Sequence, residues 1–243
     1  MKNSVNRYPA GFSLVELLVV IVIIVTLAAL SMVGFGRMRK AGDRAAAVAI
    51  MRQLVVANVG YSTDNNGQFV PIAEKDENGG LAMEWYRNPK FLTYLTGDPA
   101  ETEKSGSQLL LGPVGSLDPI VVRSKKRQWD RLSASYGLNA TGLTWPANSQ
   151  SPPMSFKVSQ IANPGRTAFI VSATNYQVTY GGRFLWKSSP VEGKTTTDKI
   201  AYRHGNQAVV VYYDSSIGFV TQSDLAAIDG NGGVSNAFWK ATP

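Results

Sequence analysis

The sequence predicts an α+β protein in which one long N-terminal helix precedes a β-rich head, and three observations carry this prediction. An apolar run covers residues 12–33 and contains a single charged residue, Glu16. Apolar residues then recur at steps of three and four as far as about residue 60, the spacing of an amphipathic helix. Beyond that point, glycines and prolines separate short segments rich in β-branched and aromatic residues, which is typical of strands.

The apolar run has the length of one membrane span. As a helix it would extend about 33 Å at about 1.5 Å per residue, close to the ~30 Å thickness of a hydrocarbon core. Glu16 lies inside the run, where a charged side chain costs roughly 2.5–3.5 kcal/mol to insert. Residues 12–33 contain no Lys, Arg or His that could pair with it. Glu16 is therefore a candidate functional residue that needs a partner from elsewhere.

Residues 11–21, Gly-Phe-Ser-Leu-Val-Glu-Leu-Leu-Val-Val-Ile, resemble the processing site of type IV pilins and type II secretion pseudopilins. The resemblance implies that a prepilin peptidase cleaves after Gly11 and methylates the new terminal amine of Phe12. It also implies that Glu16 pairs with the terminal amine of a neighbouring subunit and so sets the register of a filament. Physical chemistry agrees, because opposite charges in a medium of low dielectric constant compensate each other. In that family the subunit at the tip lacks this glutamate, so Glu16 indicates a subunit of the filament body.

The resemblance implies a domain organisation, a location and partners. Residues 1–11 are the expected leader peptide, residues 12–66 the long helix and residues 67–243 the globular head, in a pilin-like fold with the helix packed on an antiparallel sheet. Residues 12–33 are expected to lie in the membrane or the filament core. The chain is expected to cross the inner membrane once with its head outside the cytoplasm, and its filament to lie in the periplasm or at the cell surface. Expected partners are other pilin or pseudopilin subunits through their N-terminal helices, the prepilin peptidase and an assembly platform in the membrane.

Two simpler interpretations of the N-terminus explain less. A secretory signal has an apolar core of about 7–15 residues, which is shorter than this run. An ordinary membrane anchor explains the length but not the Gly-Phe-x-x-x-Glu pattern. Orientation is a difficulty for the pilin interpretation, because Lys2 and Arg7 precede the run while four cations follow it within residues 37–44. The positive-inside rule alone predicts the opposite topology. We expect the leader to determine the orientation instead, because the prepilin peptidase recognises the leader itself.

The helix is expected to continue beyond the span and to pack on a sheet. Its apolar stripe is predicted at every third or fourth position, at Ala45, Val48, Met51, Val55 and Val59. The helix is expected to end at residues 64–67, Asp-Asn-Asn-Gly, because Gly67 can adopt the left-handed conformation that ends helices.

Local patterns predict short elements in the head. A helix is expected within residues 85–95, and strands at residues 109–111, 119–122, 167–171, 176–180 and 184–186. The absence of cysteine excludes disulfides, thiolate metal sites and a thiol nucleophile.

A basic cluster surrounds Trp129 and consists of Arg123, Lys125, Lys126, Arg127 and Arg131. Basic side chains beside an aromatic ring can hold a phosphate backbone and stack a base. Short basic runs are more often solvated loops, however, and the formal net charge of the whole chain is only +7. Nucleic acid is therefore not an expected partner.

Residues 135–139 and 163–167 resemble segments of one large pseudopilin-like subgroup, which also carries a C-terminal motif of His, nine residues and Asp-Gly. His204 and Asp214 have this spacing, but Ser215 replaces the glycine, which argues against the usual tight Asp-Gly turn. We expect a structural role, with His204 opening a strand at residues 207–213 and Asp214 turning it into residues 217–221. A metal- or ligand-binding role remains open, although one imidazole without thiolates makes no closed zinc site. A Ser-His-Asp role also remains open and requires a proximity that spacing does not show.

Asp224, Asp229 and Asn231 are weak candidates for calcium binding, because calcium takes hard oxygen ligands. Their spacing matches no known loop template. No other cofactor is expected.

The sequence thus favours a non-enzymatic structural subunit of a type II secretion pseudopilus or a type IV pilus. The alternative is a membrane-anchored exported protein that uses a pilin-type leader and binds a ligand or polysaccharide with its head. An exported hydrolase is a third possibility.

Overall fold

The computed structural model describes residues 12–75, 82–97, 116–123, 132–144, 146, 151–180 and 200–242. The chain divides into two compact units, Met1–Gly42 and Asp43–Pro243. The boundary lies inside the first helix, so the second half of that helix belongs to the same unit as the head.

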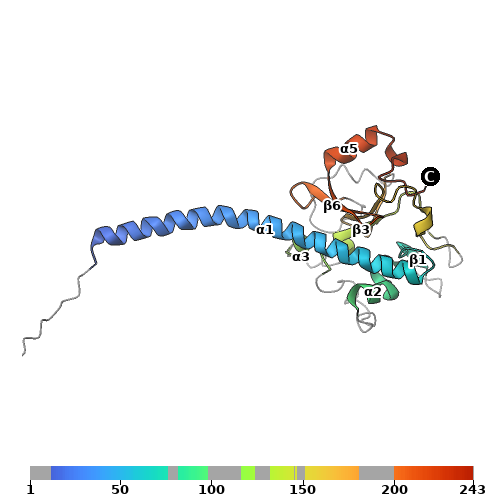
Figure 1. The fold of residues 1–243 in the computed structure, drawn as a ribbon, viewed down its shortest axis with the longest axis horizontal. Coiled ribbons are helices and arrows are strands. Elements are labelled where there is room, and N and C mark those ends of the chain that lie inside the picture. The colour runs from blue at the N-terminus through green and yellow to red at the C-terminus, as the bar shows by residue number, and fades with distance from the viewer. Residues whose placement is uncertain are drawn as a thin grey trace, which may run out of the picture. The chain divides into compact units, whose positions relative to one another are not determined.

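Helix α1 is continuous from Leu14–Asp64 and is the first element drawn in Figure 1. Its apolar part reaches a mean hydropathy of 3.0 over 18 residues, which makes α1 long and apolar enough to cross a membrane. At its other end, the Gly67 amide donates to the Ser62 carbonyl at 2.8 Å, and Gly67 has φ of 75°. This left-handed glycine confirms the predicted end of the helix.

The buried face of α1 in the head differs from the predicted stripe. Met51 and Val55 are buried as expected, but Ala45 is exposed and Val59 is 48% exposed. The buried apolar residues of this part of α1 are Ala47, Ile50, Met51, Leu54, Val55, Ala57 and Tyr61. Both stripes fit a helical period, and they differ by a rotation about the helix axis. The position of the sheet, which helical periodicity alone does not contain, selects between them.

The head is built on a five-stranded sheet with the order β5-β3-β4-β6-β7. Its strands are β3 (Tyr136–Asn139), β4 (Ala168–Ser172), β5 (Gln177–Val178), β6 (Gln207–Tyr212) and β7 (Ile217–Thr221). All neighbours are antiparallel except β3 and β5, which are parallel. A separate antiparallel pair joins β1 (Ala73–Lys75) to β2 (Ala82–Glu84).

Both faces of this sheet are covered. Val209 and Val211 of β6 belong to the core that contains the buried residues of α1. Ala208 and Val210 point the other way, into a second core with Trp239 and the helix α5 (Gln222–Gly230). Figure 1 shows α5 and the head half of α1 on opposite sides of β6. Burial on both faces explains why β6 is a continuous apolar run instead of an alternating one.

Several short elements follow the sequence and others do not. The expected helix within residues 85–95 is present as η1 (Trp85–Arg87) and α2 (Pro89–Thr96). The strand expected at residues 167–171 is present as β4, and that at residues 176–180 is shorter than expected. The expected strands at residues 109–111 and 184–186 lie outside the described residues.

The strand prediction for residues 119–122 is wrong, because this segment is the helix α3 (Pro119–Arg123). Asp118 caps it, with Oδ1 accepting a hydrogen bond from the Ile120 amide at 2.9 Å. Proline in the first helical position and aspartate before it are helix-start signals that outweigh the β-branched composition of Ile120 to Val122. Three further short elements complete the described structure: α4 (Leu132–Ser135) and the 3-10 turns η5 (Val158–Gln160) and η7 (Gly233–Ser235).

Candidate functional site: the N-terminal motif and the buried histidine

The start of α1 lies directly after the expected cleavage site and is stabilised by Glu16. Residues 13–16, Ser-Leu-Val-Glu, have the Ser-x-x-Glu pattern of a capping box. The Ser13 amide donates a hydrogen bond to Glu16 Oε2 at 2.9 Å, and the Leu17 amide donates to the Ser13 carbonyl at 3.2 Å. Glu16 therefore holds the first turn of the helix while its side chain remains exposed.

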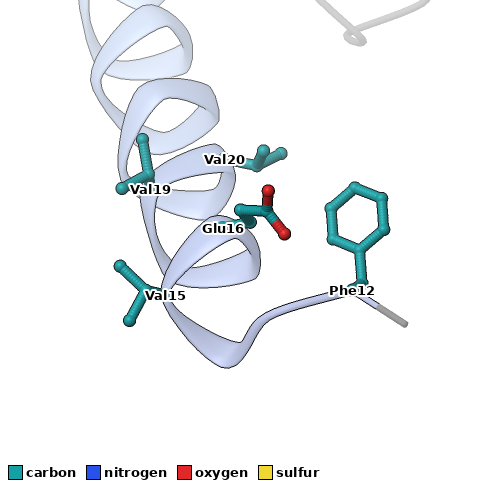
Figure 2. A pocket seen from close by; sticks show the side chains of 5 residues that line it. All are labelled: Phe12, Val15, Glu16, Val19 and Val20. Carbon is teal, nitrogen blue, oxygen red and sulfur yellow. The ribbon is translucent and has the colours of Figure 1, made fainter. Parts of the chain in front are cut away.

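A shallow groove beside Glu16 is lined by Phe12, Val15, Val19 and Val20. Figure 2 shows the Glu16 carboxylate pointing towards the side on which the Phe12 ring lies. Phe12 is 81% exposed. The large apolar side chains described in residues 14–32 are all exposed by 45% (Val20) or more. In water such a surface is unfavourable, so this segment requires lipid or other apolar helices around it.

His204 pairs with Asp118, a residue that sequence spacing does not connect to it. His204 Nε2 lies 2.9 Å from Asp118 Oδ2, and the side chains are 1% and 0% exposed. His204 lies in the turn before β6, where its backbone amide donates to the Gln207 carbonyl. Its Nδ1 has no hydrogen-bond partner in the part of the chain that the structure describes. A substrate cannot reach this pair, which argues against the catalytic role left open for His204.

The surroundings of Asp118 favour its ionised form despite its burial. Burial by itself would raise the pKa of the Asp118 carboxyl. The hydrogen bond with His204, the positive charge of Arg203 and the Ile120 amide outweigh burial and lower this pKa below its ordinary value. Arg203 is itself fixed, since Nη1 donates to the Ser135 carbonyl at 3.0 Å and Nη2 to the Ala173 carbonyl at 2.8 Å. This network connects the start of α3, the end of α4 and the residue after β4 to the turn before β6.

Asp214 lies beyond the other end of β6 and is not brought to His204. Its Oδ1 accepts hydrogen bonds from the backbone and hydroxyl of Ser216, at 2.9 and 2.6 Å, within the turn from β6 to β7. This bonding lowers the pKa of the Asp214 carboxyl. Ser215 has φ of 71°, so serine adopts the left-handed conformation that the glycine of the subgroup motif would favour. The tight turn is therefore kept, and the objection from Ser215 is wrong.

The spacing between His204 and Asp214 thus spans one strand and its two turns. The structure confirms the predicted succession of a strand (β6), a turn that contains Asp214, and a second strand (β7). The partner of His204 was missed because Asp118 is 86 positions away. The local sequence Asp118-Pro119 predicts the start of a helix, but it does not predict that Asp118 pairs with a histidine.

The segments that resemble the pseudopilin-like subgroup form structural anchors. Asn139 Nδ2 donates to the carbonyls of Ala168 and Trp239, both at 2.9 Å, and so connects β3 to the neighbouring strand β4 and to the C-terminal segment that covers the sheet. A side chain on Gly137 would place its Cβ 2.6 Å from the Asn175 carbonyl oxygen, so only glycine fits there. The membership of this particular subgroup remains a prediction.

The calcium candidates have separate intramolecular roles. Asp224 Oδ2 accepts a hydrogen bond from the Thr221 amide at 2.7 Å and caps α5. Asp229 accepts a hydrogen bond from the Tyr180 hydroxyl, and the Asn231 carbonyl accepts one from Asn236. Among the described residues, no group of three or more His, Asp or Glu side chains is arranged to hold a metal ion. Calcium binding stays a prediction.

The basic cluster around Trp129 lies outside the described residues except for Arg123. Arg123 Nη1 donates to Asp43 Oδ1 at 2.7 Å, so this cation pairs with the head half of α1.

Comparisons with known proteins match the N-terminal motif. Residues 6–32 match the family described as the prokaryotic N-terminal methylation motif. No curated protein and no solved structure matches the chain. The motif and the long apolar helix are consistent with a membrane-anchored protein that crosses the bilayer once. The methylation motif supports the assignment of this chain to the type IV pilin and pseudopilin family, as a pilin-like substrate of prepilin peptidase.

Proposed function

We propose that the chain is a structural subunit of a filament, either a type II secretion pseudopilus or a type IV pilus. Cleavage after Gly11 and methylation of Phe12 would prepare it for assembly through its N-terminal helix. The observation that carries the proposal is Glu16, an exposed carboxylate inside an apolar run, residues 12–33, that contains no Lys, Arg or His. The proposal assigns no enzymatic activity to the head.

The geometry at the helix start suits a carboxylate with two tasks. Glu16 Oε2 accepts the Ser13 amide, and a carboxylate offers about four acceptor sites in total. Capping its own helix therefore leaves Glu16 able to accept hydrogen bonds from the terminal amine of a neighbouring subunit. Cleavage after Gly11 creates that amine at Phe12, four residues before Glu16 in each chain.

This pairing would fix the axial offset between subunits. An amine and a carboxylate in an apolar helix bundle each need an opposite charge, because an unpaired buried charge costs about 3–5 kcal/mol. A subunit with both groups can contact one neighbour on each side. We therefore place this chain in the body of the filament and not at its tip.

The decisive experiment compares Glu16 variants in cells that express the filament machinery. Glu16→Leu should still be cleaved after Gly11 but should remain in the membrane pool and be absent from sheared filaments. Glu16→Asp should give an intermediate amount, because its carboxylate is one methylene shorter. Thr26→Leu is the matched control, since it also removes a polar group from the apolar run but Thr26 bonds only to carbonyls of its own helix. Wild-type incorporation of Glu16→Leu would contradict the pairing and favour a tip position. Absence of the wild-type chain from filaments would favour the membrane-anchored binding protein instead.

A further inference from the structure

Three of the four cations that follow the apolar run have no partner among the residues that the structure describes. Arg37, Arg39 and Lys40 are exposed, and no hydrogen bond or ion pair engages their side chains within the described residues. The chain has no acidic residue between Glu16 and Asp43. Asp43 itself is engaged by Arg123. The positive charge at residues 37–40 is therefore uncompensated within the described part of the chain.

Their distance from the apolar run places these cations at the depth of lipid headgroups. If residues 12–33 fill the hydrocarbon core, residues 37–40 lie about 6 to 10 Å beyond it along the helix, near the polar layer of the bilayer. Arg and Lys side chains are long enough to reach headgroups from there while their methylene groups contact apolar surface. Phe35 and Met38, which are 75% and 73% exposed, alternate with the cations and would contact the boundary of the acyl chains.

The arrangement around the helix favours lipid over a protein partner. Arg37 and Lys40 lie on nearly the same face, whereas Arg39 lies about 200° around the helix from Arg37. A protein docked on one side would contact only part of this set. Lipid headgroups surround a helix that crosses the membrane, so they can reach all three cations at once.

We infer that residues 37–40 bind the phosphate groups of anionic phospholipids at the membrane surface from which the head projects. This contact opposes withdrawal of the span from the bilayer and holds the positive charge that the positive-inside rule would place on the other side. The inference rests on membrane anchoring and not on filament assembly. It is therefore tested in a bilayer that contains no assembly machinery.

The test measures local lipid composition around the full-length chain in liposomes. Because the chain has no cysteine, Ala41→Cys gives one labelling site for a donor dye beside the cations. Energy transfer is compared between trace acceptor-labelled phosphatidylglycerol and acceptor-labelled phosphatidylcholine, in phosphatidylcholine liposomes with phosphatidylglycerol as a minor component. We expect phosphatidylglycerol to be enriched about threefold or more around the donor, because each Lys or Arg near the membrane surface attracts anionic lipid. The enrichment should disappear in about 1 M salt, where the Debye length falls to about 3 Å.

The variant Arg37→Gln/Arg39→Gln/Lys40→Gln should reduce the enrichment towards unity. The control Arg52→Gln/Lys157→Gln/Arg166→Gln removes three exposed cations from the head and should leave the enrichment unchanged. Equal transfer to both lipids in the wild type, enrichment that survives high salt, or enrichment retained by the first variant would each overturn the inference. The salt series uses the wild-type chain alone, so it decides the matter even if the triple variant fails to insert. An absence of enrichment would assign these cations to a protein partner, and it would leave the filament proposal unaffected.

Discussion

His204 Nε2 and Asp118 Oδ2 lie 2.9 Å apart in the interior of the head, although 86 positions separate the two residues in the chain. The pair links the N-terminus of α3 to the turn before β6. Neither side chain can reach water, so each supplies the other with a hydrogen-bond partner that water would otherwise provide. The stability of the head should depend on this pair more strongly than on any exposed charge.

The head is expected to fold without the membrane span. Deleting residues 1–38 retains all of the compact unit Asp43–Pro243, including the buried face of α1. The product should be soluble, and circular dichroism should show both helix and strand. An aggregating product, or one with little strand signal, would contradict the assignment of the head half of α1 to this unit.

In this head, His204→Ala should lower the free energy of unfolding by about 3–5 kcal/mol, because it leaves the Asp118 carboxylate buried without its partner. Asp118→Asn removes the charge and keeps the shape, so it should cost less. The double variant should cost less than the sum of the two single changes. Denaturant unfolding of all four proteins measures this coupling. Unchanged stability of His204→Ala, together with the loss of a bound ligand or metal, would reassign His204 to binding.

The same carboxylate should make the head sensitive to acid. The native pKa of Asp118 is lowered, so its contribution to stability is present above the ordinary pKa of aspartate, about 3.9, and is lost as the pH falls through the native value. The free energy of unfolding should therefore fall below about pH 4, and less steeply for Asp118→Asn. Asp214→Asn is the comparison, since the Asp214 pKa is also lowered but its side chain is exposed, where charge contributes little. Identical acid dependence of wild type and Asp118→Asn would show that other carboxylates dominate.

Ser215→Gly should stabilise the turn between β6 and β7. Serine at φ of 71° is in a conformation that costs an L-residue about 1–2 kcal/mol. Glycine avoids this cost but loses more conformational entropy on folding, so only part of it is recovered. We expect a net gain of about 0.5–1 kcal/mol in thermal or denaturant unfolding. Ser216→Gly is the matched control and should destabilise, because it removes the hydroxyl that donates to Asp214 at 2.6 Å. A loss of stability in Ser215→Gly would mean that the Ser215 side chain has a role of its own.

The mature chain should begin at Phe12 and carry one methyl group on its terminal amine. Mass spectrometry of protein from cells with and without the prepilin peptidase measures this directly. In the strain that lacks the peptidase, the leader should remain attached. A mature terminus near Ala29 would indicate an ordinary signal peptidase and would remove the basis of the assignment.

The sequence by itself determined the parts of this protein that depend on local pattern. The apolar run has the length of a membrane span, residues 6–32 match the N-terminal methylation motif, Gly67 ends α1, and the run at residues 207–212 forms a strand. Each of these follows from composition or periodicity within a short window. The tight turn at Ser215 shows the limit of such rules, since the surrounding hairpin imposes a conformation that serine does not favour.

Tertiary structure alone decided which face of α1 is buried, how the second layer covers the sheet, and what His204 contacts. Ala45 and Val59 fit the helical period as well as Ala47 and Ile50 do, and only the position of the sheet selects the latter pair. Asp118 reaches His204 because α3 starts beside the turn before β6, a proximity created by packing between distant segments. Periodicity describes which residues share a face, whereas burial and pairing depend on what lies opposite that face.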